Sequence, residues 1–300
     1  MLRFLVSSML LLILSSCETK FDFPDYPSPL PECHPPDCVR LALVLGGGGA
    51  KGVSHVGVLA EFEKAGIPID LIVGCSAGSV VGALYADCLD ATHVKKILKP
   101  LRTWDILDVN IWFARYGLAS GGALRRYLNK HLTCKCFEEL QTPLCVVATD
   151  LLSGELVTLN SGPIIPAVHA SAAIPFVFSP VHLHERWLVD GGSANPVPVE
   201  VAKKMGADIV IAVDLSCLLQ KKVPTHLFGV ASRSTEIFLL KQSESCLRGA
   251  DIILRPTLRL SNISMFDDKN HENVYQAGCK AAREAIPQIK SLLAQKGILL

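Results

Sequence analysis

The sequence predicts an α/β protein with a mostly parallel central sheet between two layers of helices. Short apolar runs at 41–45 and 71–73 are each followed by a glycine-containing turn and then by a helical pattern. This β-α-β-α order is typical of a doubly wound parallel sheet. The alternation continues along the chain, and half of the composition is apolar, which is enough to bury a large core. We therefore expect one three-layer α/β/α domain over residues 40–300.

The expected elements follow from apolar periodicity, turn residues and length. Short apolar runs bounded by turn residues predict strands, one of them in a hairpin after Ser153-Gly154. Longer stretches with apolar residues three and four apart predict helices. Beyond the first two strands, we expect strands at 143–149, 155–159, 187–189, 209–213 and 252–254, and helices at 77–86, 91–98, 122–132, 199–205, 229–242 and 272–293, with one more that ends near Ala65.

The N-terminal residues 1–16 have the composition of an export signal. Arg3 precedes an apolar run over 4–14, and small residues follow it. The run is about half of the roughly 20 residues that span a bilayer, so a permanent transmembrane helix is the weaker interpretation. The residues Leu14-Ser15-Ser16-Cys17 resemble a bacterial lipobox. This resemblance implies a lipidated Cys17 and an exported lipoprotein anchored to a membrane of the bacterial envelope, with a plain secretory signal as the alternative.

Residues 17–39 are expected to form a spacer between this anchor and the domain. Six prolines lie between Glu18 and Cys38 without any helical or strand period. Such a segment favours extended geometry and acts as a semi-rigid spacer that reaches up to about 60 Å. The formal net charge is only +1 and no long basic run is present, so nothing indicates a nucleic-acid partner. The sequence leaves the oligomeric state open.

The five residues Gly74-Cys75-Ser76-Ala77-Gly78 close an apolar run and open a helical pattern. A G-x-S-x-G motif between a strand and a helix presents its serine as a nucleophile on a sharp turn. Gly74 and Gly78 keep side chains away from the bent backbone beside Ser76. The alternative is that Ser76 merely caps a helix, because the motif is short. Ser76 is the candidate nucleophile.

The glycine-rich run over 46–52 follows the first expected strand. Its spacing fits a dinucleotide fingerprint, but the acidic residue expected at the end of the second strand is missing, since Asp70 precedes that strand. The Walker pattern also fails, because Lys51 comes before Gly52. What remains is a run of backbone N–H groups at a helix N-terminus, which favours negative charge. We expect an oxyanion-binding loop made by Gly47, Gly48, Gly49, Lys51 and Gly52.

Asp190 is the candidate proton acceptor for Ser76. It ends an expected strand, and in a parallel sheet the C-terminal ends of the strands gather on one side with the nucleophile turn. Gly191 and Gly192 keep space beside it for substrate. A carboxylate is a weaker base than imidazole by about two pKa units, so Asp190 must be partly desolvated to act near neutrality. The alternative is a plain turn aspartate before two glycines.

Two apolar segments are candidates for a substrate cleft. Residues 100–120 contain many large apolar side chains and form either a flexible cover over a cleft or ordinary packing against the sheet. Residues 166–180 are small and apolar, and Phe176 and Phe178 are expected to wall a cleft there.

The motifs over 47–52, 74–78 and 190–192, in this order, resemble the patatin-like phospholipase family. Asn195, Pro198 and the Ala-Ser-x-Ala-x-Pro run at 170–175 are similar to that family as well. The likeness covers roughly residues 40–215. It implies a Ser76–Asp190 dyad, an acylated Ser76, an oxyanion held by amides near Gly48 and Gly49, and neither metal nor cofactor. Lys51 stands where many members have arginine, which keeps the positive charge.

We therefore expect a serine acyl hydrolase of the phospholipase A or lysophospholipase type, acting on phospholipids or other acyl lipids. The alternatives are a carboxylesterase for small soluble esters and an inactive lipoprotein that binds lipid or a protein partner. A serine, acid and histidine triad would need His226 or His271, since these are the histidines after Asp190. His55 and His169 are interpreted as structural.

Overall fold

The computed structural model describes residue 36 and residues 38–109, 116–216, 223–225, 227–257 and 270–298 of the 300-residue chain. The export signal, Cys17 and nearly all of the spacer lie outside these residues. No helix within the described ranges is both long enough and apolar enough to cross a membrane.

The eight-stranded sheet is mostly parallel along its main path, β5-β6-β3-β2-β1-β7-β8, and β4 also pairs with β3. The strands β1, β2, β3, β7 and β8 pair in parallel, whereas β4, β5 and β6 join in antiparallel pairs. The strands are β1 (Leu41–Leu45), β2 (Leu71–Cys75), β3 (Leu144–Asp150), β4 (Leu156–Leu159), β5 (Val181–Leu183), β6 (Arg186–Asp190), β7 (Ile209–Val213) and β8 (Ile252–Leu254).

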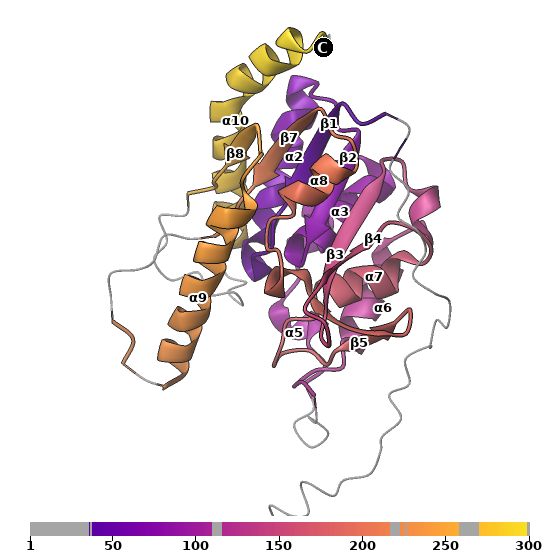
Figure 1. The fold of residues 1–300 in the computed structure, drawn as a ribbon, viewed down its shortest axis with the longest axis vertical. Coiled ribbons are helices and arrows are strands. Elements are labelled where there is room, and N and C mark those ends of the chain that lie inside the picture. Colours follow the sequence, from indigo (N-terminus) through magenta and orange to yellow (C-terminus); the bar gives the residue numbers. More distant parts are fainter. Residues whose placement is uncertain are drawn as a thin grey trace, which may run out of the picture.

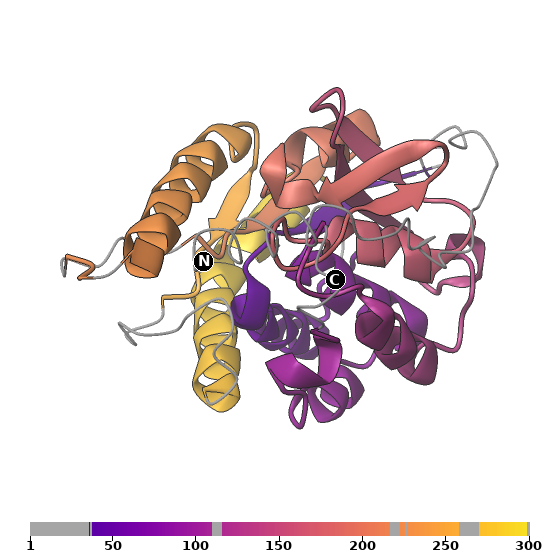
Figure 2. The same ribbon diagram turned by 90° about the horizontal axis from the view of Figure 1, so that it is seen from below.

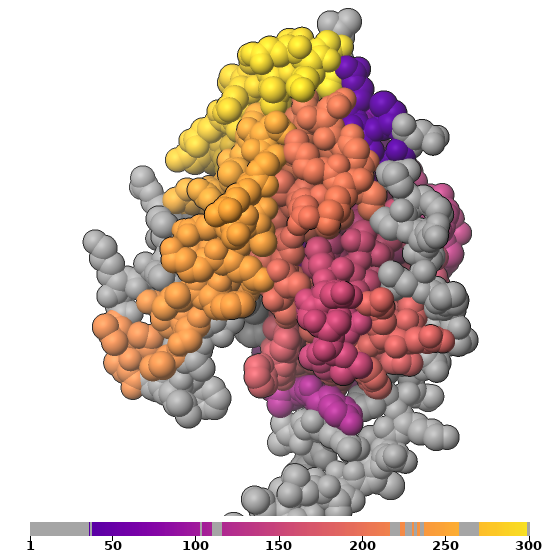
Figure 3. Space-filling model, viewed as in Figure 1, coloured from indigo at the N-terminus to yellow at the C-terminus, as the bar shows by residue number. Residues whose placement is uncertain are grey.

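Helices cover both faces of the sheet, which confirms the expected three-layer α/β/α class. Figures 1 and 2 show α8 and α9 on one side, with α2 and α10 on the other. In Figure 3, α9 stands out from the body of the molecule. The helices are α2 (Val53–Ala65), α3 (Ala77–Cys88), α4 (Ala91–Leu98), α5 (Thr103–Ile106), α6 (Gly122–His131), α7 (Ile164–Ser171), α8 (Val199–Lys204), α9 (Leu227–Cys246) and α10 (His271–Gln295), with short 3-10 turns η1 (Gly49–Gly52), η3 (Phe137–Glu139) and η4 (Gly191–Ser193).

The sheet separates two apolar cores. In β1, Leu41, Leu43 and Leu45 face one core, and Ala42 and Val44 face the other. All five side chains are fully buried, because successive residues of a strand point to opposite faces and both faces are covered. This explains why the central strands are continuous apolar runs rather than alternating ones.

The antiparallel strand β6 approaches the nucleophile turn from an unexpected direction. Strand β4 pairs with residues 146–149 of β3, so β2 and β6 must share the opposite edge of β3. On that edge β2 ends at Cys75, opposite Val147, and β6 ends at Asp190, opposite Ala148. The two strands therefore meet end to end. The expectation that Asp190 lies at the C-terminal end of a parallel strand is wrong, because β6 is antiparallel to β3. Asp190 lies near Ser76 because the C-terminal ends of β2 and β6 are adjacent along β3.

Candidate active site

Ser76 lies on a strained turn between β2 and α3. Its backbone has φ 52° and ψ −120°, a conformation that residues with a side chain rarely adopt. A Cβ atom at Gly78 would lie 2.0 Å from the carbonyl oxygen of Leu45, and one at Gly74 would lie 2.7 Å from Cα of Ser79. Both positions of the motif thus require glycine, and the turn has the geometry of a nucleophile elbow.

Neighbouring serines hold the Ser76 backbone in this conformation. The N–H of Ser76 donates to Oγ of Ser171, at the end of α7, over 3.1 Å. The hydroxyl of Ser79 donates to the Ser76 carbonyl over 2.6 Å, and the Ser79 N–H donates to the same oxygen over 2.9 Å. Ser171 and Ser79 are fully buried, so these bonds are not exchanged with water. The strained turn is therefore fixed by the two helices on either side of it.

The Ser76 hydroxyl donates to Oδ2 of Asp190 over 2.6 Å. The other carboxylate oxygen accepts the N–H of Gly192 over 2.7 Å. The Asp190 backbone is anchored as well, because its N–H donates to Ala173 O and its carbonyl accepts the hydroxyl of Thr149. The structure brings together the two residues that the sequence proposed as nucleophile and proton acceptor.

Burial raises the pKa of Asp190 from its ordinary value of 3.8 to about 6, although the hydrogen bonds from Ser76 and Gly192 oppose the shift. Within the described ranges, no ion pair joins Asp190 to a cationic side chain. The desolvation that the sequence argument required for a carboxylate base is therefore present. A Cβ at Gly191 would lie 2.3 Å from Val147 O, so the turn after Asp190 packs directly on β3.

The glycine-rich loop lies beside the Ser76 turn. A Cβ at Gly47 would contact Cβ of Ser76 at 3.4 Å, and one at Gly52 would lie 2.7 Å from Cβ of Ala77. The N–H of Gly47 already donates to Pro196 O, and the N–H of Lys51 donates to Gly48 O.

Within the part of the chain that the structure describes, the amides of Gly48 and Gly49 have no hydrogen-bond partner. Gly49 also has φ 57°, the left-handed conformation that glycine adopts readily. The Lys51 ammonium donates to Leu215 O over 3.3 Å. Of the expected oxyanion loop, the Gly47 and Lys51 amides are thus bonded to backbone carbonyls and those of Gly48 and Gly49 are not, and Gly49 lines the cavity that contains Ser76.

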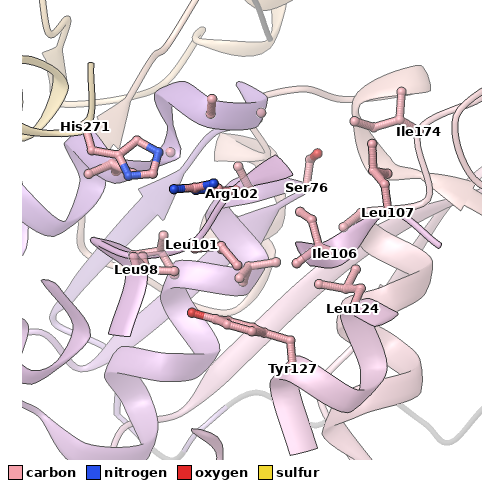
Figure 4. A pocket seen from close by; sticks show the side chains of 18 of the residues that line it. Ser76, Leu98, Leu101, Arg102, Ile106, Leu107, Leu124, Tyr127, Ile174 and His271 are labelled. Atoms are coloured by element: carbon pink, nitrogen blue, oxygen red, sulfur yellow. The ribbon is translucent and has the colours of Figure 1, made fainter. Parts of the chain in front are cut away.

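Ser76 opens into an apolar cavity of about 140 Å³. This space is an order of magnitude larger than the roughly 10–15 Å³ that one water requires. Figure 4 shows Ile106, Leu107 and Leu124 on one side of Ser76, with Arg102 and His271 on the other. The lining is mostly aliphatic, and it further includes Val80, Val81, Leu98, Leu101, Tyr127, Ile174 and Phe178.

Both apolar segments, 100–120 and 166–180, contribute residues to the wall of the cavity. In residues 100–120, Leu101, Ile106 and Leu107 pack against the core and line the cavity. Ile111, Trp112 and Phe113 lie outside the described residues. Phe178 walls the cavity as expected, whereas Phe176 points to solvent.

The histidines differ in their surroundings. His55 is buried and contacts Gly46 O over 2.8 Å, and burial lowers its pKa to about 4. His169 is also buried, and burial with the nearby Arg125 charge lowers its pKa to about 3. His271 lines the cavity at the start of α10, where Nδ1 lies 3.4 Å from Lys99 O. His226 lies outside the described residues. No group of three or more His, Cys, Asp or Glu in the described ranges is placed to hold a metal ion.

Comparison with known proteins identifies the family. The family model described as Patatin-like phospholipase matches residues 43–203, more than half of the chain. The chain belongs to the patatin-like phospholipase family. The matched range contains the glycine-rich loop, the Ser76 turn and Asp190, so the resemblance seen in the sequence motifs is confirmed.

Relatives of the chain carry names of the same family. Patatin-like phospholipase domain-containing protein 6 of Mus musculus is 35% identical over 199 residues, which cover 62% of this chain and 14% of that protein. An uncharacterized NTE family protein of Mycobacterium tuberculosis is 37% identical, over 59% of this chain and 49% of its own length. Lysophospholipase NTE1 of Debaryomyces hansenii is 32% identical, over 61% of this chain and 13% of its own length. The chain thus matches less than half of each of these relatives.

A solved structure shows the same fold. VipD from Legionella pneumophila aligns with a TM-score of 0.57 and 13% sequence identity, over 92% of this chain and 72% of VipD. At this identity the likeness concerns the fold, and it agrees with the three-layer α/β/α architecture.

Proposed function

We propose that the protein is a serine acyl hydrolase that cleaves fatty-acyl esters of membrane lipids through a Ser76–Asp190 dyad. The observation that carries this proposal is the 2.6 Å hydrogen bond from the Ser76 hydroxyl to a buried carboxylate, at the wall of an apolar cavity. A serine paired directly with a base that is itself held by further hydrogen bonds is the arrangement of an activated nucleophile.

In the proposed reaction, Asp190 Oδ2 accepts the proton of Ser76 as Oγ attacks the ester carbonyl carbon. The carbonyl oxygen becomes an oxyanion, and the N–H groups of Gly48 and Gly49 stabilise it at the N-terminal side of η1 and α2. The ester C–O bond then breaks, and Asp190 returns its proton to the departing alkoxide. A water molecule repeats the sequence on the acyl-enzyme, which releases the fatty acid and restores the Ser76 hydroxyl.

The electrostatics suit this role near neutral pH. With a pKa of about 6, Asp190 is mostly ionised at pH 7 and is still a stronger base than an ordinary carboxylate. General-base catalysis is most effective when the pKa of the base lies near the working pH. Because the carboxylate is buried, its interaction with the serine hydroxyl is not weakened by water.

The cavity and the relatives support an acyl lipid as substrate. The aliphatic lining beside Ser76 offers an acyl chain an environment free of water. The names patatin-like phospholipase and lysophospholipase, carried by relatives, point to the same class.

Covalent labelling with a fluorophosphonate tests the proposal most directly. The wild-type chain should be labelled at Ser76, and Ser76→Ala should lose both the label and fatty-acid release from phosphatidylcholine and lysophosphatidylcholine. Ser193→Ala is a suitable control, because this exposed serine lies three residues after Asp190. Hydrolysis of short soluble esters alone would indicate a carboxylesterase. A folded protein without labelling would indicate a binding protein instead.

From the sequence we further propose that the chain is exported and anchored through a lipidated Cys17. Its support is the Leu14-Ser15-Ser16-Cys17 pattern after a short apolar run. Mass spectrometry of the mature N-terminus tests it. Retention of Arg3, or an unmodified Cys17 in membrane-fractionated protein, would contradict this part of the proposal.

A further inference from the structure

Four large apolar side chains are exposed around the cavity that contains Ser76. Trp104 on α5 is 72% exposed, and Phe176, between α7 and β5, is 88% exposed. Val109 and Leu118 are 43% and 46% exposed. We call these four side chains the apolar rim. Exposed aromatic and aliphatic side chains that gather at one place mark an interaction surface more often than isolated ones do.

Backbone hydrogen bonds connect the segments of the rim. Val109 forms a bridge with Ala119, and Ala119 forms one with Phe178. The N–H of Leu118 donates to Phe176 O over 3.2 Å, and the N–H of Ala119 donates to Val177 O over 2.8 Å. The segments that carry Val109, Leu118 and Phe176 are therefore neighbours in space.

The rim is continuous with the wall of the cavity. Trp104 lies between Arg102 and Ile106, both of which line the cavity. Phe176 lies between Ile174 and Phe178, which line it as well. Both exposed aromatic side chains are thus flanked in sequence by residues that line the cavity. Figure 1 labels α5, α6 and β5 together at the end of the molecule away from the C-terminus.

Phe176 lies in a hydrogen-bonded turn, in which the N–H groups of Val177 and Phe178 donate to Ile174 O and the Phe176 carbonyl accepts the N–H of Leu118. Its φ of 68° is unfavourable for a residue with a large side chain, and its ring remains almost entirely in solvent. Strain at an exposed aromatic residue is typical of a functional site rather than of packing.

We propose that the apolar rim docks on the surface of a lipid bilayer and inserts Trp104 and Phe176 into the interfacial region. The inference rests on the proposed acyl-lipid substrate. A rim that continues into an aliphatic cavity allows an acyl chain to pass from the bilayer to Ser76 with little exposure to water. Tryptophan is especially favourable at the boundary between lipid and water, since its ring is apolar and its N–H is polar. Side chains that penetrate only the interface bind reversibly, in proportion to the apolar area they bury.

Vesicle binding by an inactive protein tests this inference separately from catalysis. The chain from residue 17 onward, with Cys17→Ser and Ser76→Ala, carries neither the apolar run over 4–14 nor a lipid anchor nor the nucleophile, so vesicle binding does not depend on any of these. We expect it to sediment with phosphatidylcholine vesicles. Trp104→Ser together with Phe176→Gly should lower the partition coefficient at least tenfold, about 1.4 kcal/mol. Glycine suits φ 68°, so Phe176→Gly should not unfold the chain.

Ile253→Ser provides the matched control. Ile253 on β8 is 40% exposed, similar to Val109, and it lies at the opposite edge of the sheet from β5. This variant should bind vesicles like its parent. The inference is overturned if the rim variants bind as well as the parent, if Ile253→Ser loses binding equally, or if the rim variants change only the oligomeric state. A protein without hydrolase activity that still binds through the rim would overturn the proposed function and leave this inference standing.

Discussion

Asp150 and Asp190 lie on paired strands and have the same small exposed fraction, yet their carboxyl groups have opposite properties. Asp150 ends β3, Asp190 ends β6, and each is 6% exposed. Burial by itself acts to raise the pKa of both carboxyl groups. In Asp150, the N–H groups of Leu152 and Ser153 and the Arg186 guanidinium outweigh this effect and hold its pKa below the ordinary value.

Asp190 has weaker compensation, since its side chain accepts one backbone N–H and one hydroxyl. The ionised carboxylate is therefore poorly stabilised, and it readily accepts a proton from Ser76. The comparison teaches that burial alone does not make a buried carboxylate a base. The absence of a cation partner among the described residues, together with a serine hydroxyl at 2.6 Å, distinguishes Asp190, the proposed base, from Asp150.

The largest expected difference between the two aspartates is in turnover. Asp190→Asn removes the proton acceptor and should lower kcat on the order of 10⁴-fold, as removal of a catalytic carboxylate does in other serine hydrolases. Asp150→Asn keeps the carbonyl oxygen that accepts from Leu152 and Ser153, so it should retain most of its activity. Fatty-acid release by both variants under saturating substrate measures the difference. Equal losses in the two variants would mean that Asp190 acts through the fold and not as the base.

Replacement by asparagine should change the free energy of unfolding in opposite directions at the two aspartates. The raised pKa of Asp190 means that the folded state holds its proton more strongly than the unfolded state, so this stabilising contribution is present below pH 4 and is lost as the pH rises through 6. At pH 7 the ionised carboxylate costs about 3 kcal/mol, since each pKa unit corresponds to about 1.4 kcal/mol. Asp190→Asn should therefore raise the free energy of unfolding at pH 7 by up to this amount.

Asp150→Asn should do the reverse, because the stability from its depressed pKa is present above the ordinary pKa and is lost as the pH falls. Loss of the contact with Arg186 should cost about 1 kcal/mol at pH 7. Urea unfolding of the wild type and both variants at pH 4 and pH 7 measures both effects. A destabilised Asp190→Asn variant at pH 7 would show that the Asp190 charge is compensated in solution.

The pH dependence of activity sharpens the assignment of the base. If Asp190 must be ionised, kcat/KM should fall about tenfold for each pH unit below 6 and reach a plateau above it. Imidazole groups in general titrate in a similar range, so the profile alone does not separate a dyad from a triad. His226→Ala and His271→Ala decide between them. The same acidic limb in both variants supports the dyad, and its disappearance in either one would favour a histidine base.

Much of the fold and part of the site could be predicted from local sequence. The continuous apolar strands and the helices that follow glycine turns depend on residues close together in the chain, and the structure shows them. The sharp turn at Ser76 is present as well, and its role as a nucleophile elbow stays a prediction. The antiparallel course of β6 was missed, because strand direction depends on a pairing between residues 148 and 190 that no local pattern reveals. Helix α7 was also missed, since its small apolar residues carry little periodicity.

The supporting hydrogen bonds were less predictable than the reacting residues. Ser171 contacts Ser76 across 95 positions of sequence. The only signal for it was its place in the small-residue run at 170–175, which indicated the family and not a hydrogen bond. His271 reaches the cavity because α10 packs along α2, where a Cβ at Gly57 would lie 2.2 Å from Tyr275 O. Such contacts depend on packing between distant elements.

Ser171→Ala tests whether the strained turn requires support, and it should reduce turnover less than Asp190→Asn does. The variant leaves the buried N–H of Ser76 without its acceptor, which should cost about 1–3 kcal/mol of stability. Because the turn at φ 52° is itself strained, we expect it to relax partly and to move Oγ from its position against Asp190. Turnover should fall roughly tenfold with little change in KM, since the cavity is unchanged and only the reacting geometry is disturbed.

Two further variants separate positioning by Ser171 from a general loss of stability. Ser171→Thr retains the accepting oxygen and should restore part of kcat. Ser243→Ala removes an equally buried hydroxyl of α9, one that donates to Asp214 directly after β7. It should therefore reduce stability without reducing kcat. If Ser243→Ala lowers kcat as much as Ser171→Ala does, the Ser76 turn holds its conformation without Ser171, and its rigidity comes from Gly74, Gly78 and the contacts of α3 alone.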